Sequence, residues 1–243
     1  MNTFYDINPF YYGYSSIDSI VKNMNPLLKD LIKKNSNKVI CDIGCGCGRN
    51  LFYSCKYSKY VTGIDISDKS LEIAKKNINC SSLKLVKGDN LNIPLKNSTA
   101  DVVISDGVCH HTGDTYKAFS ECIRILKPCG TLYLAVYKKF RYYPLLYIFV
   151  GGFFRLIKKY KLGDKLLENF FVKFHYLFYV LFKKQRLSQI EVRNIFYDYF
   201  ITPIATFQSK SDVNKWCLNT NSRIIKYDRT SGNCHVFLIK KND

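Results

Sequence analysis

The stretch Cys41-Asp42-Ile43-Gly44-Cys45-Gly46-Cys47-Gly48-Arg49-Asn50 holds three cysteines and three glycines in ten residues. It follows the short apolar run Val39-Ile40-Cys41 and precedes a segment, from Asn50-Leu51 onward, that we expect to be a helix. Two interpretations are open at this point. The stretch is either a cysteine-based metal site or a loop whose glycines let a ligand approach the backbone closely.

Apolar runs alternate with helical patterns along the first half of the chain. Strands are expected at 39–41, 60–65, 83–86, 100–105 and 131–137, with a closing strand pair at 223–227 and 234–239. Helices are expected at 16–34, from 50 onward, at 67–77 with Ser67 as the cap, at 115–126 and at 211–218. Repeated strand–helix units predict an α/β fold, with a mostly parallel sheet of seven strands and helices on both faces.

The composition changes between residues 138 and 208. The runs Tyr142–Leu156 and Leu166–Phe182 are rich in aromatic residues. The first contains Pro144 and is too short to span a bilayer, and the second carries charged residues beside an aromatic helical face. We therefore predict an inserted helical cap. The predicted units are an N-terminal helical segment over the site (1–35), a core (36–137), the cap (138–208), and a C-terminal helix with the strand pair (209–243).

Polar residues stand where the predicted strands end. They are Asp42, Asp65, Asp89 and the pair Ser105-Asp106. Parallel sheets of this kind bind ligands at the carboxyl ends of their strands. The sequence therefore predicts that these side chains converge on one crevice.

The spacing of the glycine loop and the next acid favours a ligand with a ribose. Asp65 lies about twenty residues beyond the loop, a spacing suited to gripping ribose hydroxyls. A nicotinamide dinucleotide fits the same spacing, but its fingerprint requires a third glycine where Arg49 stands. The carboxylate of Asp42 would also repel a pyrophosphate, whereas it suits a cationic or zwitterionic ligand.

A metal site is disfavoured by the cysteine spacing. Tetrahedral zinc requires paired spacings such as C-x2-C and a second pair of ligands. The Cys45-x-Cys47 arrangement does not supply these, and the other cysteines are scattered singly. We expect Cys45 and Cys47 to be small packed side chains, and no metal to be bound.

Five stretches in order resemble the motifs of class I S-adenosylmethionine (SAM) dependent methyltransferases, in particular the methyltransferase type 11 and quinone-biosynthesis-like group. The stretches are Val39–Gly48, Gly63–Ser67, Gly88–Asn90 with Ile93–Leu95, Asp101–His111, and Arg124–Leu132. The resemblance covers roughly residues 36–137 and the closing strand pair. It implies a Rossmann-like core and SAM as the cofactor.

The resemblance also assigns roles by position. The loop from Gly44 through Cys45 and Gly46 would hold the methionine part of SAM, with Asp42 near its amino group. Asp65 would take the ribose hydroxyls, and Ile66 would pack beside the adenine. Asp89 and Asn90 would meet the adenine amino group, and Ser105 and Asp106 would close the methionine end. His110 follows the fourth strand, where the acceptor should lie, and is a candidate for a catalytic or positioning role.

Three hypotheses remain for the function. The first is methyl transfer to a small apolar or lipid-like acceptor, because Val108-Cys109-His110-His111 resembles quinone-biosynthesis enzymes and the aromatic cap can cover a greasy substrate. The second is methylation of a modified wobble uridine in tRNA, whose enzymes share a Val-x-His-His segment. The third is a non-catalytic partner protein with the SAM fold.

Net charge and cysteine content limit the partners and the location that we expect for the protein. The formal net charge of +18 favours polyanions, either RNA or an anionic membrane surface met through residues 142–184. The chain opens without a secretory signal, so its ten cysteines indicate reduced thiols. We expect a cytoplasmic protein, with a position at the periphery of a membrane as a further hypothesis.

Overall fold

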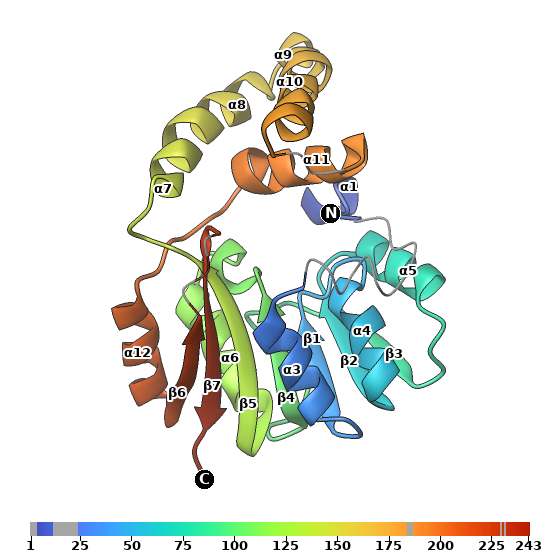
Figure 1. Cartoon of the computed structure of the whole chain (residues 1–243), viewed down its shortest axis with the longest axis vertical. Coiled ribbons are helices and arrows are strands. Elements are labelled where there is room, and N and C mark those ends of the chain that lie inside the picture. The colour runs from blue at the N-terminus through green and yellow to red at the C-terminus, as the bar shows by residue number, and fades with distance from the viewer. Residues whose placement is uncertain (1–3, 12–23, 184–186, 229, 231) are drawn as a thin grey trace.

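The computed structural model describes residues 4–11, 24–183, 187–228, 230 and 232–243. Seven strands form one sheet in the order β3-β2-β1-β4-β5-β7-β6, and only β7 runs antiparallel to its two neighbours (Figure 1). The strands are β1 (Val39–Ile43), β2 (Tyr60–Asp65), β3 (Leu83–Lys87), β4 (Ala100–Asp106), β5 (Leu126–Tyr137), β6 (Ser222–Asp228) and β7 (Cys234–Lys241). This confirms the predicted seven-stranded, mostly parallel sheet.

Helices cover both faces of the sheet. On one face lie α3 (Pro26–Lys34), α4 (Arg49–Tyr57) and α5 (Asp68–Asn77), and on the other lie α6 (Thr115–Ile125) and α12 (Lys210–Asn219). The strands alternate their side chains between two cores, as the period of two demands. In β5, for example, Leu132 and Leu134 pack towards α6, whereas Tyr133 packs towards α3.

The described part of the helix predicted over 16–34 is not helical at residues 24 and 25. Residues 16–23 of that prediction lie outside the described residues, and α3 begins at Pro26. The Asn25 side chain accepts a hydrogen bond from the backbone N–H of Leu27 at 2.8 Å. Asn25 is thus the N-cap, and Pro26 takes the first helical position, where its missing N–H costs nothing.

The described residues of the inserted cap form three helical stretches above the carboxyl ends of the strands (Figure 1). The first joins α7 (Tyr143–Leu145), η2 (Leu146–Gly151) and α8 (Gly152–Ile157). The second joins α9 (Lys161–Leu166), η3 (Leu167–Phe171), α10 (Val172–Phe178) and η4 (Tyr179–Lys183), and the third joins α11 (Gln189–Phe196) and η5 (Tyr197–Ile201). The η2, η3, η4 and η5 segments are π-helical turns. A short N-terminal helix, α1 (Phe4–Ile7), lies between the cap and the sheet (Figure 1).

Candidate active site

The glycine loop between β1 and α4 is shaped by backbone conformations that favour glycine. Gly44, Gly46 and Gly48 have φ angles of +69°, +52° and +95°, in the left-handed region that costs other residues free energy. A Cβ on Gly44 would lie 2.3 Å from a methyl carbon of Val108, whereas a Cβ on Gly46 would meet no atom within 4 Å. Gly44 therefore allows close packing, and Gly46 leaves open space beside the backbone.

Asp65 at the end of β2 is held by two backbone amides. Its Oδ2 accepts the N–H of Gly46 at 2.8 Å, and its Oδ1 accepts the N–H of Ser67 at 2.9 Å. The side chain is largely buried, and burial raises its pKa even though both amide bonds favour the carboxylate. The bond to Gly46 ties the strand end directly to the glycine loop.

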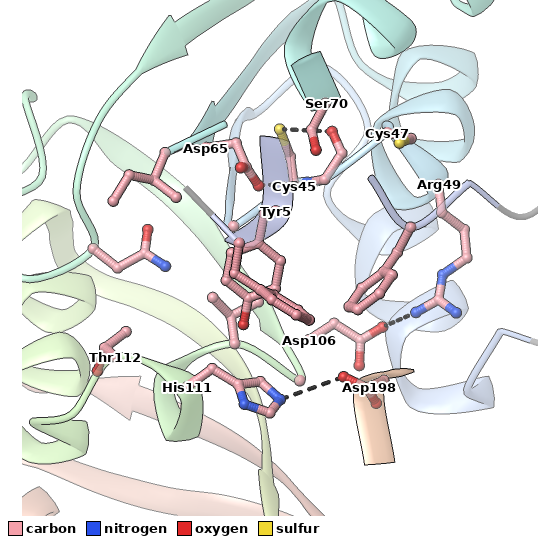
Figure 2. Close-up of a pocket in the computed structure, with 18 of the residues that line it drawn as sticks. Tyr5, Cys45, Cys47, Arg49, Asp65, Ser70, Asp106, His111, Thr112 and Asp198 are labelled. Atoms are coloured by element: carbon pink, nitrogen blue, oxygen red, sulfur yellow. Dashed lines mark hydrogen bonds and ion pairs between the residues drawn. The ribbon is translucent and has the colours of Figure 1, made fainter. Parts of the chain in front are cut away.

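A second acidic group lies at the ends of β1 and β4. Arg49 forms an ion pair with Asp106 at 2.8 Å (Figure 2). Asp42 is buried behind them, and its Oδ2 has no hydrogen-bond partner among the described residues. Burial, and then the negative charge of Asp106, raise the pKa of Asp42 well above its usual range. A cationic ligand placed here would relieve this repulsion.

A third acidic position follows β3. The Oδ1 of Asp89 accepts the N–H of Leu91 at 2.8 Å, which leaves its other oxygen available to a ligand. The neighbouring Asn90 has a side-chain oxygen without a partner in the described part of the chain. Ile66, at the end of β2, is 40% exposed. Asp89, Asn90 and Ile66 line the same cavity as Asp65.

This cavity has a volume of about 540 Å³, within the range of small-molecule sites. Of the ten residues predicted to bind the cofactor, eight line it: Gly44, Cys45, Gly46, Asp65, Ile66, Asp89, Asn90 and Asp106. The other two lie behind the wall. Asp42 is 1% exposed, and Ser105 is fully buried with its hydroxyl 3.1 Å from the sulfur of Cys109.

The two histidines after β4 have different surroundings. His110 is fully buried with its ring centroid 3.7 Å from that of Tyr137, and burial lowers its pKa well below the usual range. His111, not His110, lines the cavity. Both belong to the short 3₁₀ turn η1 (Cys109–His111), which turns neighbouring side chains in different directions. The role predicted for His110 remains a prediction, and its burial gives it no direct access to a ligand.

His111 faces an acid from the cap. Its Nδ1 lies 2.7 Å from the carbonyl oxygen of Ile204, so Nδ1 carries the hydrogen and donates it. Its Nε2 lies 3.5 Å from Oδ1 of Asp198, within ion-pair distance but outside hydrogen-bond geometry (Figure 2). The hydroxyl of Tyr137 donates to Oδ2 of Asp198 at 2.9 Å. Asp198 is thus held at the cavity wall from two sides.

Several cavity residues lacked any signal in the local sequence pattern. They include Phe4, Tyr5 and Phe10 from the N-terminal segment and Asp198, Tyr199 and Pro203 from the cap. Tyr5 stands between Asp65 on one side and His111 and Asp198 on the other (Figure 2). Burial and then the charges of Asp198 and Asp65 raise its pKa, so the phenol stays neutral. Tyr5 thus separates two acidic regions of one cavity.

The loop cysteines are buried thiols. Burial raises the pKa of Cys45 well above its usual range and that of Cys47 to about 12, which disfavours the thiolate that a metal requires. In the part of the chain that the structure describes, no three His, Cys, Asp or Glu side chains form a group that could hold a metal ion. Cys45 and Cys47 instead pack around the loop, with Cys45 in the small core under α4 and α5.

The strand order, the glycine loop and the acidic strand ends define a class I SAM-dependent methyltransferase. A family model described as a methyltransferase domain matches residues 41–134. The matched part of the chain is therefore a methyltransferase domain of the class I SAM-dependent type, whose cofactor is SAM.

Curated relatives are distant and match in part. A mouse protein named probable tRNA methyltransferase 9B is 29% identical over 136 residues, covering 50% of this chain and 29% of the relative. The ubiquinone biosynthesis O-methyltransferase of Actinobacillus pleuropneumoniae serotype 7 is 29% identical over 123 residues, covering 46% of this chain and 53% of the relative. The chain thus spans between 29% and 53% of these relatives' length.

Solved structures share the fold at low sequence identity. A SAM-dependent methyltransferase from Mesorhizobium loti aligns with a TM-score of 0.62 at 12% identity and covers 93% of this chain and all of that one. The magnesium protoporphyrin IX methyltransferase of Synechocystis, with S-adenosylhomocysteine bound, aligns with a TM-score of 0.59 at 14% identity, covering 93% and 83%. Similarity at this level supports the fold and does not identify the methyl acceptor.

Proposed function

We propose that this protein transfers the methyl group of SAM to a small apolar or lipid-like acceptor. The observation that carries the proposal is the composition of the cavity of about 540 Å³. Its floor is formed by acids and glycines at the strand ends, and its roof by aromatic side chains from the N-terminal segment and the cap. One cavity thus offers a polar half for a charged cofactor and an aromatic half for an acceptor.

The residues of the polar half fit SAM. Asp65 keeps acceptor capacity on both carboxylate oxygens beyond its two amide bonds, which suits the ribose hydroxyls. The open space beside Gly46 suits the close passage of the methionine part, and Asp106 suits a cationic group. We propose that Asp89, Asn90 and Ile66 surround the adenine.

Asp42 and Ser105 would act from behind the wall. The charge of Asp42 would favour the amino group of the cofactor without touching it, because the carboxylate is buried. The hydroxyl of Ser105 is engaged with Cys109, so we propose that it supports the end of β4 beneath Asp106.

SAM supplies an activated methyl group, so the chain's main tasks are to orient the acceptor and exclude water. An acceptor hydroxyl must also lose a proton. We propose that the pair of Asp198 and His111 takes this proton, because both line the aromatic half and lie 3.5 Å apart. A positive charge on the imidazole would be stabilised by the adjacent carboxylate. Tyr137 would position Asp198 by its hydrogen bond.

Asp198→Asn tests this role. The amide keeps the size of the side chain but can neither take the proton nor supply the negative charge beside a protonated His111, so turnover should fall by about a hundredfold or more. The affinity for SAM should be unchanged, because Asp198 faces the other half of the cavity. Turnover equal to that of the wild type would exclude Asp198 as the proton acceptor.

A tRNA acceptor is the second candidate. It is favoured by the net charge of +18 and by relatives named as probable tRNA methyltransferases. The aromatic roof of the cavity offers little to a phosphate backbone, which places this candidate second. A non-catalytic role as a partner protein is the third candidate, and the open cavity with its acidic strand ends speaks against it.

Incubation of the protein with methyl-labelled SAM and cell extract separates the three candidates. The proposal expects label in the organic-soluble fraction. We expect the acceptor to come from the cytoplasm or from the periphery of a membrane. Label in RNA would replace the proposal with the tRNA function. Absence of transfer to any fraction, despite SAM binding, would favour the partner role.

A further inference from the structure

The cap exposes an unusual amount of apolar surface. Of the 26 large hydrophobic side chains exposed among the described residues, 19 lie between Phe140 and Ile190. We call these 19 side chains the apolar cap surface. Its most exposed members on the first two helical stretches are Leu145, Phe149, Leu162, Phe170, Phe174 and Leu181. Single exposed apolar residues are ordinary, but a concentration of this kind marks a surface that contacts something else.

The apolar cap surface follows helical periodicity. On the second stretch, Leu162, Leu166, Phe170 and Phe174 recur every four residues, which places them on one side of the helix. The other side of the same stretch is also apolar, since Leu167 and Val172 are buried in the cap's own core with Phe154 and Phe196. A helix that is apolar on both sides requires a second apolar environment.

Among the residues that the structure describes, none of the helices has the length and apolar character of a transmembrane span. Exposed aromatic and aliphatic side chains on short helices are instead typical of helices that lie in the plane of a membrane interface.

Positive charges accompany the apolar cap surface. Lys159, Lys161, Lys165 and Lys173 are exposed on or between the same helices, and none has an acidic partner among the described residues. The nearby acids Asp164 and Glu168 are already paired, with Lys158 and Arg193 respectively. The surface therefore keeps an excess of positive charge beside its apolar residues, which complements anionic lipid headgroups.

A basic pocket adjoins the start of this surface. It has a volume of about 440 Å³, and its lining includes Phe140, Arg141, Lys210 and His235. Lys138 also lines it, but its buried ammonium donates to the carbonyl oxygens of Thr230 and Gly232. Phe140 is 83% exposed and continues into Tyr142 of the apolar cap surface. The Nε of Arg141 has no hydrogen-bond partner in the described part of the chain. Exposed apolar and basic side chains thus lie next to each other.

We propose that the apolar cap surface docks on a bilayer that contains anionic phospholipids. The aromatic side chains enter the interface, and the lysines and the basic pocket meet the headgroups. The docking itself is independent of catalysis. Its consequence, that the acceptor is taken from the bilayer, rests on the proposed methyl transfer and places the cavity roof at the lipid surface.

Co-sedimentation of the full chain with lipid vesicles tests the proposal. Vesicles of phosphatidylcholine with about 30% phosphatidylserine should bind the protein at least tenfold more tightly than phosphatidylcholine alone. The variant Phe149→Asp/Phe174→Asp should bind the anionic vesicles at least tenfold more weakly than the wild type. Leu218→Asp is the matched control, because Leu218 is 73% exposed but lies on α12, away from the cap. It should bind as the wild type does.

A second variant probes the charges. Lys159→Ala/Lys161→Ala/Lys165→Ala should weaken binding to the anionic vesicles and reduce its dependence on salt. Circular dichroism of each variant should match that of the wild type, because all the changed side chains are exposed.

Two results would overturn the docking. One is equal vesicle binding by Phe149→Asp/Phe174→Asp and the wild type. The other is a protein dimer without vesicle binding that this variant dissociates, which would assign the apolar cap surface to a second copy. SAM calorimetry on the same samples separates the two proposals: vesicle binding without SAM binding would refute the methyl transfer and leave the docking standing.

Discussion

The sheet and the cap use their apolar residues in opposite ways. Around the sheet, β5 buries Leu132, Leu134 and Val136 completely, and exposed large apolar side chains are scattered. In the cap, one side of the helices forms a small core around Phe154, while the other side leaves most of its apolar residues exposed. The apolar content of the sheet is therefore explained by its own fold, whereas that of the cap is explained only by a partner. The active-site cavity lies between the two.

The largest expected effect contrasts one phenylalanine from each region. Phe119 of α6 is fully buried with its ring centroid 5.5 Å from that of Trp216, so Phe119→Ala should lower the free energy of unfolding by about 3–5 kcal/mol. Phe149 is 71% exposed, and Phe149→Ala should change the free energy of unfolding by less than about 0.5 kcal/mol. Urea unfolding measures both. A large loss for Phe149→Ala would show that this side chain is buried in solution and would break the comparison.

The next effect concerns the loop that joins the sheet to the cavity. Gly44→Ala would place a Cβ 2.3 Å from Val108 at a φ of +69°, and should destabilise the fold by about 3 kcal/mol. Gly46→Ala places a Cβ at a φ of +52° without a clash, and should lower the free energy of unfolding by only about 1 kcal/mol. Equal losses of stability in the two variants would contradict the close packing inferred for Gly44.

A smaller effect, opposite in sign, is expected at Asp42. The pKa of Asp42 is raised in the folded state, so the folded protein binds a proton there more tightly than the unfolded chain does. This carboxyl therefore lowers the free energy of unfolding as the pH rises above its unfolded pKa. Asp42→Asn should therefore stabilise the protein at neutral pH, on the order of 1 kcal/mol. The gain should shrink as the pH falls towards 4, roughly the unfolded pKa of an aspartate.

Thermal unfolding of Asp42→Asn as a function of pH checks the sign. The same variant should bind SAM more weakly, because the negative charge behind the cofactor is lost. Destabilisation at neutral pH would mean that the carboxylate is paired or hydrated in solution.

Local patterns were sufficient for the sheet and for most of the polar half of the cavity. The strand at Tyr60–Asp65 and the cap at Ser67 were predicted with their observed bounds, because β-period alternation and capping chemistry act within a few residues. The helix start at Pro26 was missed although Asn25-Pro26 carries a capping signal, since the apolar spacing before it was followed instead.

The aromatic half of the cavity lay beyond such patterns. Asp198 reaches His111 from 87 positions further along the chain, through packing of the cap on the sheet, and nothing in its local sequence marks it. Tyr5 reaches the cavity from the other end of the chain in the same way. The choice between His110 and His111 depends on the direction of one 3₁₀ turn, which two adjacent histidines do not reveal.

The most direct test of the account is calorimetric titration of the protein with SAM, compared with Asp65→Ala. We expect binding at one site, and an affinity at least about tenfold lower for the variant, because Asp65 links the glycine loop to the proposed ribose contact. Asp89→Ala is a useful second variant, since it changes an exposed acid at the proposed adenine end. Absence of SAM binding by the wild-type protein at millimolar cofactor would contradict the claim that the cavity binds SAM. Equal affinities of the wild type and Asp65→Ala would show that Asp65 does not contact the ribose.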